Sequence, residues 1–249
     1  MISNFLPLFN GIWFNAFLIN FVVIFFGQKL PFLTKKGWIH AGVLGTLLLG
    51  SVGWKGWISV CVYLLLGTLV TKIGYKNKAS RGIAEARGGL RGPENVWGSA
   101  ATGCSLAILS CLFPENLTLF MVGFASSFTA KLSDTFSSEI GKRFGKRTFL
   151  ITSLKSVEPG TEGAISIEGS VAGLLGSLIM TVVMINLAII SGLSVAFIVL
   201  LSGFLATIIE SYIGAVAQNK INWLTNELVN SIQTSISAMI SIYLYLIFI

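Results

Sequence analysis

Apolar residues run in long stretches along this chain of 249 residues, and short polar segments separate them. A stretch of about 17–25 mainly apolar residues is long enough to cross the hydrocarbon core of a bilayer as an α-helix. The pattern therefore predicts an all-α, polytopic transmembrane helix bundle of six to eight spans, forming a single membrane domain over residues 1–249. The expected spans are 11–27, 37–53, 56–72, 96–113, 117–133, 167–190, 194–217 and 229–248, with a short turn over 53–56 between the second and the third.

Composition supports a membrane protein and argues against a soluble one. Hydrophobic residues make up 54% of the chain and charged residues only 11%, whereas about 25% of residues are charged in an average soluble domain. The net charge of +7 comes from basic residues in loops beside apolar helices. We therefore expect no nucleic-acid partner, and we attribute the positive charge to membrane topology.

The distribution of Lys and Arg predicts the orientation of the helices. If the N-terminus lies outside, nearly all basic residues fall on one side and only Lys55 faces the other. By the positive-inside rule the crowded side is cytoplasmic. Two long segments on that side, 74–95 and 134–168, mix glycine with positive charge and are the expected functional loops. Their simplest alternative role is to contact anionic lipid head groups as solvated basic loops.

An acidic residue lies where the fifth span leaves the membrane. On a continuous helix Asp134 shares one face with Ser127, Lys131 and Ser138, whereas Glu139 points about 140° away from it. Asp134 is therefore the better candidate for a metal ligand. The alternative is a polar helix end at which Lys131 pairs with Asp134.

Polar groups also occur inside the last two spans. Glu210 is expected at roughly 10 Å from the cytoplasmic end of its helix, and acids at such depth usually face a polar interior. The last helix carries a stripe of amides and a hydroxyl, for part of which hydrogen bonding between helices is the plain interpretation. The stripe consists of Asn226, Asn230, Gln233 and Ser237, of which we assign Gln233 and Ser237 to such structural bonds.

A weak internal parallel repeat links these polar groups. Asn95 precedes a helix pair that ends at Asp134, and Glu168 precedes a helix pair that leads to Glu210. A parallel repeat would place the two acids near one interface. Small residues are common in membrane helices, so a chance likeness is the alternative.

Carboxylates and amides beside basic, glycine-rich loops favour phosphate chemistry. These oxygens suit Mg²⁺, which commonly binds through one or two carboxylates together with substrate phosphates. Phosphoryl transfer requires positioning and charge neutralisation more than a nucleophilic side chain. The chain contains no GxxxxGK[ST] phosphate-binding loop, and its single histidine, His40, cannot form a metal cluster with other histidines.

Four segments resemble the membrane family that includes phytyl-phosphate kinase of plants and cyanobacteria. They are DTFSSEIG at 134–141, PGTEGAISIEGS at 159–170, ESYIGA at 210–215 and NELVN at 226–230. The resemblance covers roughly 76–230, and the first two segments in this order are its most specific part. Glu210 stands where the family is associated with Asp, and RGPENVWG at 91–98 follows the family's first basic motif only loosely.

The resemblance implies a nucleotide-dependent kinase that converts an isoprenoid monophosphate to the diphosphate in tocopherol and related prenyl-lipid synthesis. The implied cofactor is Mg²⁺, the implied co-substrate is CTP or another nucleoside triphosphate, and the implied partners are an isoprenoid phosphate lipid and membrane lipids. The expected catalytic residues are Asp134, Glu139, Lys155 and Glu210, and the expected metal ligands are Asp134, Glu168 and Glu210. The expected phosphate-binding residues are Arg81, Arg87, Arg91, Asn95, Gly160, Thr161, Gly163, Ser166, Asn226 and Asn230.

Two other functions share these features. A transporter or flippase for a lipid phosphate would also use a buried acid and repeated halves, but its polar groups should lie near the bilayer centre. A lipid cytidylyltransferase would form a nucleotide-linked product from the same substrates. We expect the active site on the cytoplasmic face of a plasma or thylakoid-type membrane, and the sequence indicates no oligomeric state.

Overall fold

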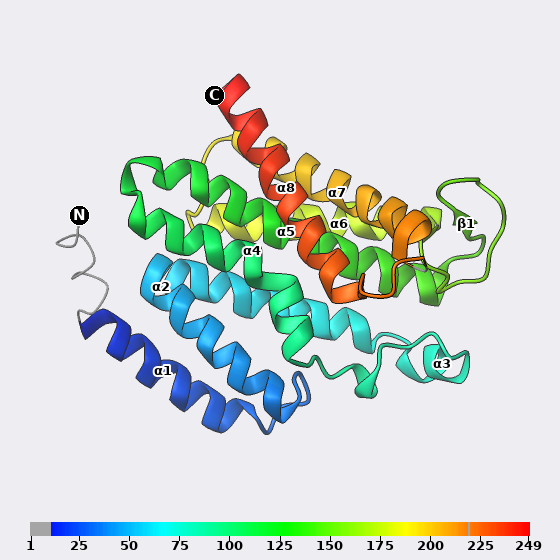
Figure 1. Ribbon diagram of the computed structural model, residues 1–249, viewed down its shortest axis with the longest axis horizontal. Helices are drawn as coiled ribbons and strands as arrows, with labels where there is room; N and C mark the ends of the chain where they lie inside the picture. The colour runs from blue at the N-terminus through cyan, green and yellow to red at the C-terminus, as the bar shows by residue number, and fades with distance from the viewer. Residues whose placement is uncertain (1–10, 219) are drawn as a thin grey trace.

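The computed structural model describes residues 11–218 and 220–249. Long helices dominate this part of the chain, together with short helical turns and a two-stranded antiparallel ribbon (Figure 1). The α-helices are α1 (Gly11–Gly27), α2 (Lys35–Lys72), α3 (Tyr75–Ser80), α4 (Pro93–Leu112), α5 (Leu117–Phe144), α6 (Ile167–Asn186), α7 (Leu193–Ile213) and α8 (Asn226–Phe248). The shorter elements are η3 (Arg87–Gly89), η4 (Pro114–Asn116), β1 (Phe149–Leu150), β2 (Ala164–Ile165) and the π-helical turn η5 (Gly214–Gln218).

Helix α2 contains two of the expected spans. Its 38 residues would extend ~57 Å at ~1.5 Å per residue, which is far more than the ~30 Å hydrocarbon core. Gly53 interrupts the helical geometry with φ 69° and ψ −162°, a conformation that glycine adopts without steric cost. The chain reverses direction there (Figure 1). The expected turn over 53–56 is thus shorter than predicted, because one glycine suffices.

The all-α membrane bundle is confirmed. Five helices of the described chain are long and apolar enough to cross a membrane, namely α2, α4, α6, α7 with its π-helical extension, and α8. Helix α1 is shorter and equally apolar, and large side chains such as Ile12, Phe14 and Phe21 are exposed on it. Exposed apolar side chains on so many helices fit contact with lipid tails.

Helix α5 is the centre of the bundle. It packs against α2, α4, α6, α7 and α8, and a run of its residues from Met121 to Ser133 is buried. Its Ser, Thr, Lys and Asp side chains make it too polar to count among the apolar spans. It covers the expected span 117–133 but continues to Phe144, so the first part of the expected loop 134–168 is helix.

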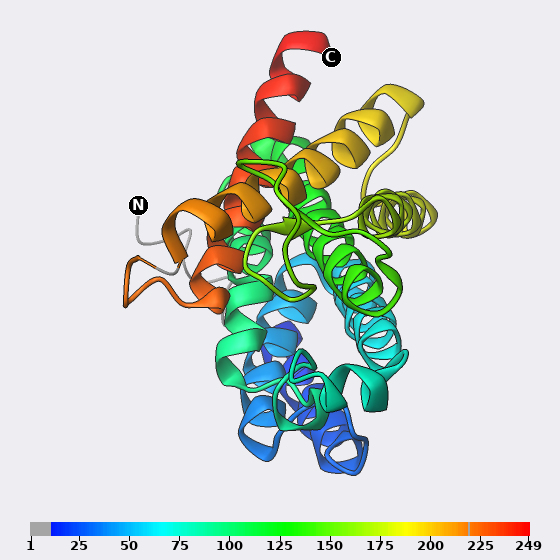
Figure 2. The same cartoon turned by 90° about the vertical axis from the view of Figure 1, so that its right-hand side faces the viewer.

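The polar connections gather at one end of the bundle. In Figure 1 the segment with α3 and the loop with β1 lie at the same end, and Figure 2 looks onto it. The strands pair in register Phe149 with Ile165 and Leu150 with Ala164, which closes the loop between α5 and α6. Both expected functional loops are therefore at one end, which we call the polar end.

Candidate functional site

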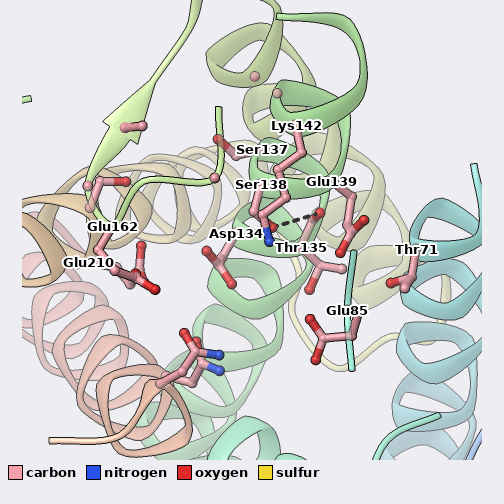
Figure 3. A pocket seen from close by; sticks show the side chains of 18 of the residues that line it. Thr71, Glu85, Asp134, Thr135, Ser137, Ser138, Glu139, Lys142, Glu162 and Glu210 are labelled. Carbon is pink, nitrogen blue, oxygen red and sulfur yellow. Dashed lines mark hydrogen bonds between the residues drawn. The ribbon is translucent and has the colours of Figure 1, made fainter. Parts of the chain in front are cut away.

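A cavity of about 370 Å³ opens at the polar end. Its walls come from α2, α4, α5, α6, α7 and α8 and from the two loops between α3 and α4 and between α5 and α6 (Figure 3). Most of the residues expected at a site line this single cavity. They are Arg91, Asn95, Asp134, Glu139, Gly160, Thr161, Gly163, Ser166, Glu210, Asn226 and Asn230.

Four of the expected residues do not line the cavity. Arg81 is exposed and donates to the backbone oxygen of Lys142, and Lys155 is exposed in the loop after β1. Glu168 lies in the first turn of α6, where its carboxylate accepts from the backbone N–H of Lys146. Arg87 lies outside the lining, yet it reaches the site because its guanidinium donates to Asn95 Oδ1 at 2.7 Å.

Three carboxylates share one side of the cavity. Asp134 comes from α5, Glu210 from α7, and Glu162 from the loop that precedes β2. In Figure 3, Glu162 and Glu210 lie next to each other and Asp134 faces them. The two acids that the weak repeat relates thus meet at one site, while the repeat itself remains a prediction.

A buried lysine links this acidic side to the last helix. Lys131 Nζ donates to Asp134 Oδ2 at 2.5 Å and to Asn230 Oδ1 at 2.8 Å. Lys131 is 6% exposed, so its charge depends on these partners instead of on water. The expected Lys131–Asp134 pair is present, but it lies inside the cavity wall and not on a solvated helix end.

Glu139 has a dedicated partner. It forms a hydrogen-bonded ion pair with Lys78 of α3, and both side chains are buried. Lys78 also donates to the backbone oxygen of Thr71 at 3.0 Å, so it joins α2, α3 and α5. The pair neutralises Glu139 as Lys131 neutralises Asp134, whereas the lining acids Glu85, Glu162 and Glu210 form no ion pair with a described residue.

A basic and an aromatic residue, Arg91 and Tyr63, also line the cavity. Arg91 Nη1 donates to the Tyr63 hydroxyl at 3.1 Å, and its guanidinium lies 5.3 Å from the centre of that ring. Asn95 Oδ1 accepts from the backbone N–H of Gly92 at 2.9 Å as well as from Arg87. These contacts hold Arg91 and Asn95 in fixed positions in the cavity wall, and a guanidinium presents donors suited to phosphate oxygens.

The loop 159–164 is docked against α7 through a glycine. Gly163 has φ 75°, and a Cβ on it would lie 2.4 Å from Ala215 Cβ and 2.6 Å from Ser211 O. This close approach brings the neighbouring Glu162 to the cavity. Burial raises the pKa of the Glu162 carboxyl; the nearby Lys142 opposes the rise and Asp134 adds to it.

The charges of the cavity favour divalent cations as part of any phosphate complex. Five described acids line it against three basic residues, so phosphate anions would meet a net negative wall. No three Asp, Glu, His or Cys side chains in the described chain form a ready metal cluster, and the expected set Asp134, Glu168 and Glu210 is not brought together. The oxygen donors nevertheless fit Mg²⁺, which often uses one or two carboxylates plus substrate phosphates.

The amide stripe of α8 divides between site and scaffold. Gln233 Nε2 donates to Ala130 O and to Thr207 Oγ1, each at 3.2 Å, and the Ser237 and Ser126 hydroxyls are 2.6 Å apart. These are the expected bonds between helices. Asn230 and Asn226, which precede Gln233 by about one and two helical turns, line the cavity instead.

Several lining residues were not anticipated from the sequence. Glu162 lies inside the GTEG part of the motif that contains Gly160 and Gly163, so the motif itself was the available signal. Tyr63 and Lys142 carried no signal of this kind. Lys78, which holds Glu139, could not have been found, because 61 residues separate the partners.

Comparisons with known proteins identify relatives along most of the chain. The family model described as "Integral membrane protein DUF92" matches residues 18–238. A membrane protein of Synechocystis sp. is 45% identical over 92% of this chain and 90% of its own length. "Protein VTE6, chloroplastic" of Arabidopsis thaliana is 41% identical over 92% of this chain and 71% of its own length.

The family extends beyond photosynthetic organisms. A membrane protein of Methanocaldococcus jannaschii is 31% identical over 93% of this chain and 94% of its own length. No solved structure matches the chain.

Proposed function

The chain belongs to the DUF92 family of integral membrane proteins, and we propose that it is a prenyl-phosphate kinase. It would transfer a phosphoryl group from a nucleoside triphosphate, CTP or another, to an isoprenoid monophosphate such as phytyl phosphate. The products would be the isoprenoid diphosphate and a nucleoside diphosphate. The sequence motifs that resemble the phytyl-phosphate kinase family support this reaction, since Asp134, Gly163 and Glu210 from three of them line one cavity.

The observation that carries the proposal is the pairing of acids with fixed cations at the membrane end. Asp134, Glu162 and Glu210 lie near one another in the cavity (Figure 3), Lys131 pairs with Asp134, and Arg91 lines the same cavity. Phosphoryl transfer depends mainly on positioning and on neutralising the phosphate charges. A cavity lined by both acidic and basic side chains can position the phosphates and neutralise their charge.

The metal would be held by the acidic side. Asp134, Glu162 and Glu210 offer carboxylate oxygens there, and bound Mg²⁺ would neutralise nucleotide phosphates and the transferred group. Arg91 and Lys142 would donate to phosphate oxygens. Lys131 would keep Asp134 in place through their hydrogen bond.

The acceptor needs little help from a base. An oxygen of the isoprenoid phosphate forms the new bond to the γ-phosphorus, and the bond between that phosphorus and the β,γ-bridging oxygen breaks. A phosphate monoester has its second pKa at about 6, so the attacking oxygen is already ionised near neutral pH. The role of Asp134 is therefore in binding and not in removing a proton.

The biological setting follows from the proposed reaction. Isoprenoid diphosphates feed tocopherol and related prenyl-lipid synthesis, and a relative bears the word chloroplastic in its name. We place the protein in a plasma or thylakoid-type membrane with the cavity on the cytoplasmic face. The basic residues of the polar end support that side.

The test is a product analysis with purified protein in detergent. Phytyl phosphate, Mg²⁺ and each nucleoside triphosphate would be incubated in turn, and the lipid products would be identified by mass. The proposal expects phytyl diphosphate and loss of turnover in excess chelator. A nucleotide-linked lipid would identify a cytidylyltransferase, and unchanged phytyl phosphate with every nucleotide would favour transport.

A further inference from the structure

A second, apolar crevice adjoins the polar cavity. It has a volume of about 90 Å³ and lies among α1, α2 and α4. Its walls are mostly aliphatic and aromatic, with Leu44, Leu48, Val60 and Val96 among them. The crevice and the polar cavity share the lining residues Tyr63, Arg91, Asn95 and Ser99.

The crevice runs from the polar cavity toward the opposite side of the bundle. Tyr63 marks its polar end, and Trp57, six residues earlier on the same helix, lies ~9 Å away along the axis at ~1.5 Å per residue. The far end is closed by a hydrogen bond from Trp57 Nε1 to Asn20 Oδ1 at 2.9 Å. An elongated ligand with a phosphate at Arg91 would therefore extend its tail into the bilayer region of the protein.

The crevice also opens toward lipid. Val23 of α1 and Cys61 of α2 both line it, and both are exposed. An apolar molecule could thus enter sideways from the bilayer without passing through water. Its small volume fits one narrow apolar chain.

One polar group of the crevice lacks a partner. Trp38 is 7% exposed, and its indole N–H has no hydrogen-bond acceptor among the described residues. Buried donors without a partner are uncommon. An occupant that carries oxygen atoms at one end and is apolar elsewhere would account for both the donor and the walls.

We propose that this crevice binds the first isoprene units of the acceptor, while Arg91 and Asn95 hold its phosphate at the mouth of the polar cavity. This proposal rests on the proposed kinase function, because that function defines the acceptor. It assigns the lipid to the side of α1, α2 and α4. The nucleotide then occupies the side of Glu162 and Glu210.

The first experiment fills the crevice and measures binding without nucleotide. Ala41 lines the crevice and is half-buried, whereas Val43 on the same helix is 51% exposed and points to lipid. Binding of radiolabelled phytyl phosphate would be compared for Ala41→Phe and the matched control Val43→Phe in nanodiscs. Each methylene group excluded from an apolar site costs about fourfold in affinity, so we expect about tenfold weaker binding for Ala41→Phe and no change for Val43→Phe.

Two further ligands identify the occupant. Phytol, which lacks the phosphate, should bind more weakly than phytyl phosphate, and phosphatidic acid should not compete. Equal affinities in Ala41→Phe and Val43→Phe would overturn the crevice assignment. If phosphatidic acid competes strongly with phytyl phosphate and Ala41→Phe abolishes that competition, the crevice binds a phospholipid, and the isoprenoid is rejected as its occupant.

A second measurement does not depend on the folding of a variant. Cys61 lines the crevice, whereas Cys111 is also exposed but lies outside it. Phytyl phosphate should slow modification of Cys61 by a maleimide severalfold and leave Cys111 unchanged, as read by mass spectrometry. Equal modification of Cys61 with and without the lipid would contradict the proposal.

The two proposals can fail separately. Protection of Cys61 together with weaker binding by Ala41→Phe would support the crevice even if no nucleotide gave a product, and then only the kinase would be rejected. Turnover of phytyl phosphate without either effect would leave the kinase standing and reject the crevice.

Discussion

Buried charge at the polar end is balanced residue by residue. Lys131 has Asp134 and Asn230 as hydrogen-bond partners, and Lys78 has Glu139. Breaking a buried pair leaves an uncompensated charge, which usually costs more than the pair itself contributes. Glu139 and Lys78 therefore serve the scaffold, whereas Glu162 and Glu210 remain available to ligands.

Asp134→Asn should lower turnover by about 100-fold or more, because it removes a ligand charge with little change of shape. Glu210→Gln should act in the same direction, and Glu210→Asp should recover part of the activity because it keeps the charge. Steady-state product formation in detergent measures all three. Glu115→Gln, at an exposed acid of the opposite end, is the control. A near-normal rate for Asp134→Asn would mean that Asp134 binds no ligand and serves only as a polar residue at the end of its span.

The acid side of the pH–rate profile should depend on Lys142. Burial raises the pKa of Glu162 and Lys142 opposes the rise, so Lys142→Met should raise that pKa further. A protonated carboxyl no longer binds a cation, and activity should therefore be lost at a higher pH in the variant as pH falls. Lys146→Met, at an exposed lysine nearby, should keep the wild-type midpoint of the acid limb of the pH–rate profile. If Lys142→Met and Lys146→Met have the same midpoint, Glu162 is not the group whose protonation abolishes activity.

At the scale of elements, α5 and the loop after it position most of the site. The helix continues beyond the expected membrane end and carries Asp134 into the cavity, and the loop returns through Gly163 to dock on α7. Two elements that are adjacent in sequence thus line the same cavity.

Gly163→Ala should disrupt the site far more than Gly82→Ala. Both glycines have positive φ, 75° and 72°, so both substitutions carry the cost of about 1–2 kcal/mol for a left-handed residue. Only at Gly163 would the new methyl group collide with α7, whereas Gly82 has no atom within 4 Å of that position. Measurements of turnover and thermal stability for the two variants separate the collision with α7 from the backbone strain. Equal losses of turnover and stability in both variants would mean that backbone strain alone matters.

The elements were largely predictable and the loop was not. Apolar stretches of bilayer length are a strong signal, so the helices lie where they were expected. The reversal at Gly53 and the extension of α5 depend on single residues and on burial by neighbours, which a hydropathy pattern does not contain. Lys155 and Glu168 were expected at the site, but the folding of the loop leaves both outside the cavity, and nothing local determines that path.

At the scale of the whole molecule, charge and cavity lie at the same end. The connections at the other end are tight, such as η4 between α4 and α5, and they leave little room for a second opening. This asymmetry suits an enzyme that works at one membrane surface better than a transporter with access from both.

The orientation can be tested independently of the reaction. Single cysteines at Asn77 and Arg147, both exposed at the polar end, and at Glu115 at the other end would be placed in a chain without its own three cysteines. A membrane-impermeant maleimide applied to intact cells should label only Glu115→Cys, because the positive-inside rule places the basic end in the cytoplasm. Labelling of Asn77→Cys and Arg147→Cys alone would reverse the topology.

Helix α5 is poorly suited to enter a bilayer alone, because it carries Lys131 and Asp134 besides many Ser and Thr side chains, and ionisable groups in a membrane helix are costly. Asp134 follows Lys131 by one turn and cancels its charge within the same helix, and the short η4 turn lets α4 and α5 enter together as a hairpin. Helices α6, α7 and α8 are synthesised later and then bury α5. Assembly of the cavity is therefore a late event in biogenesis, since a nascent chain that stops before α8 lacks Asn226 and Asn230 and thus part of the cavity wall.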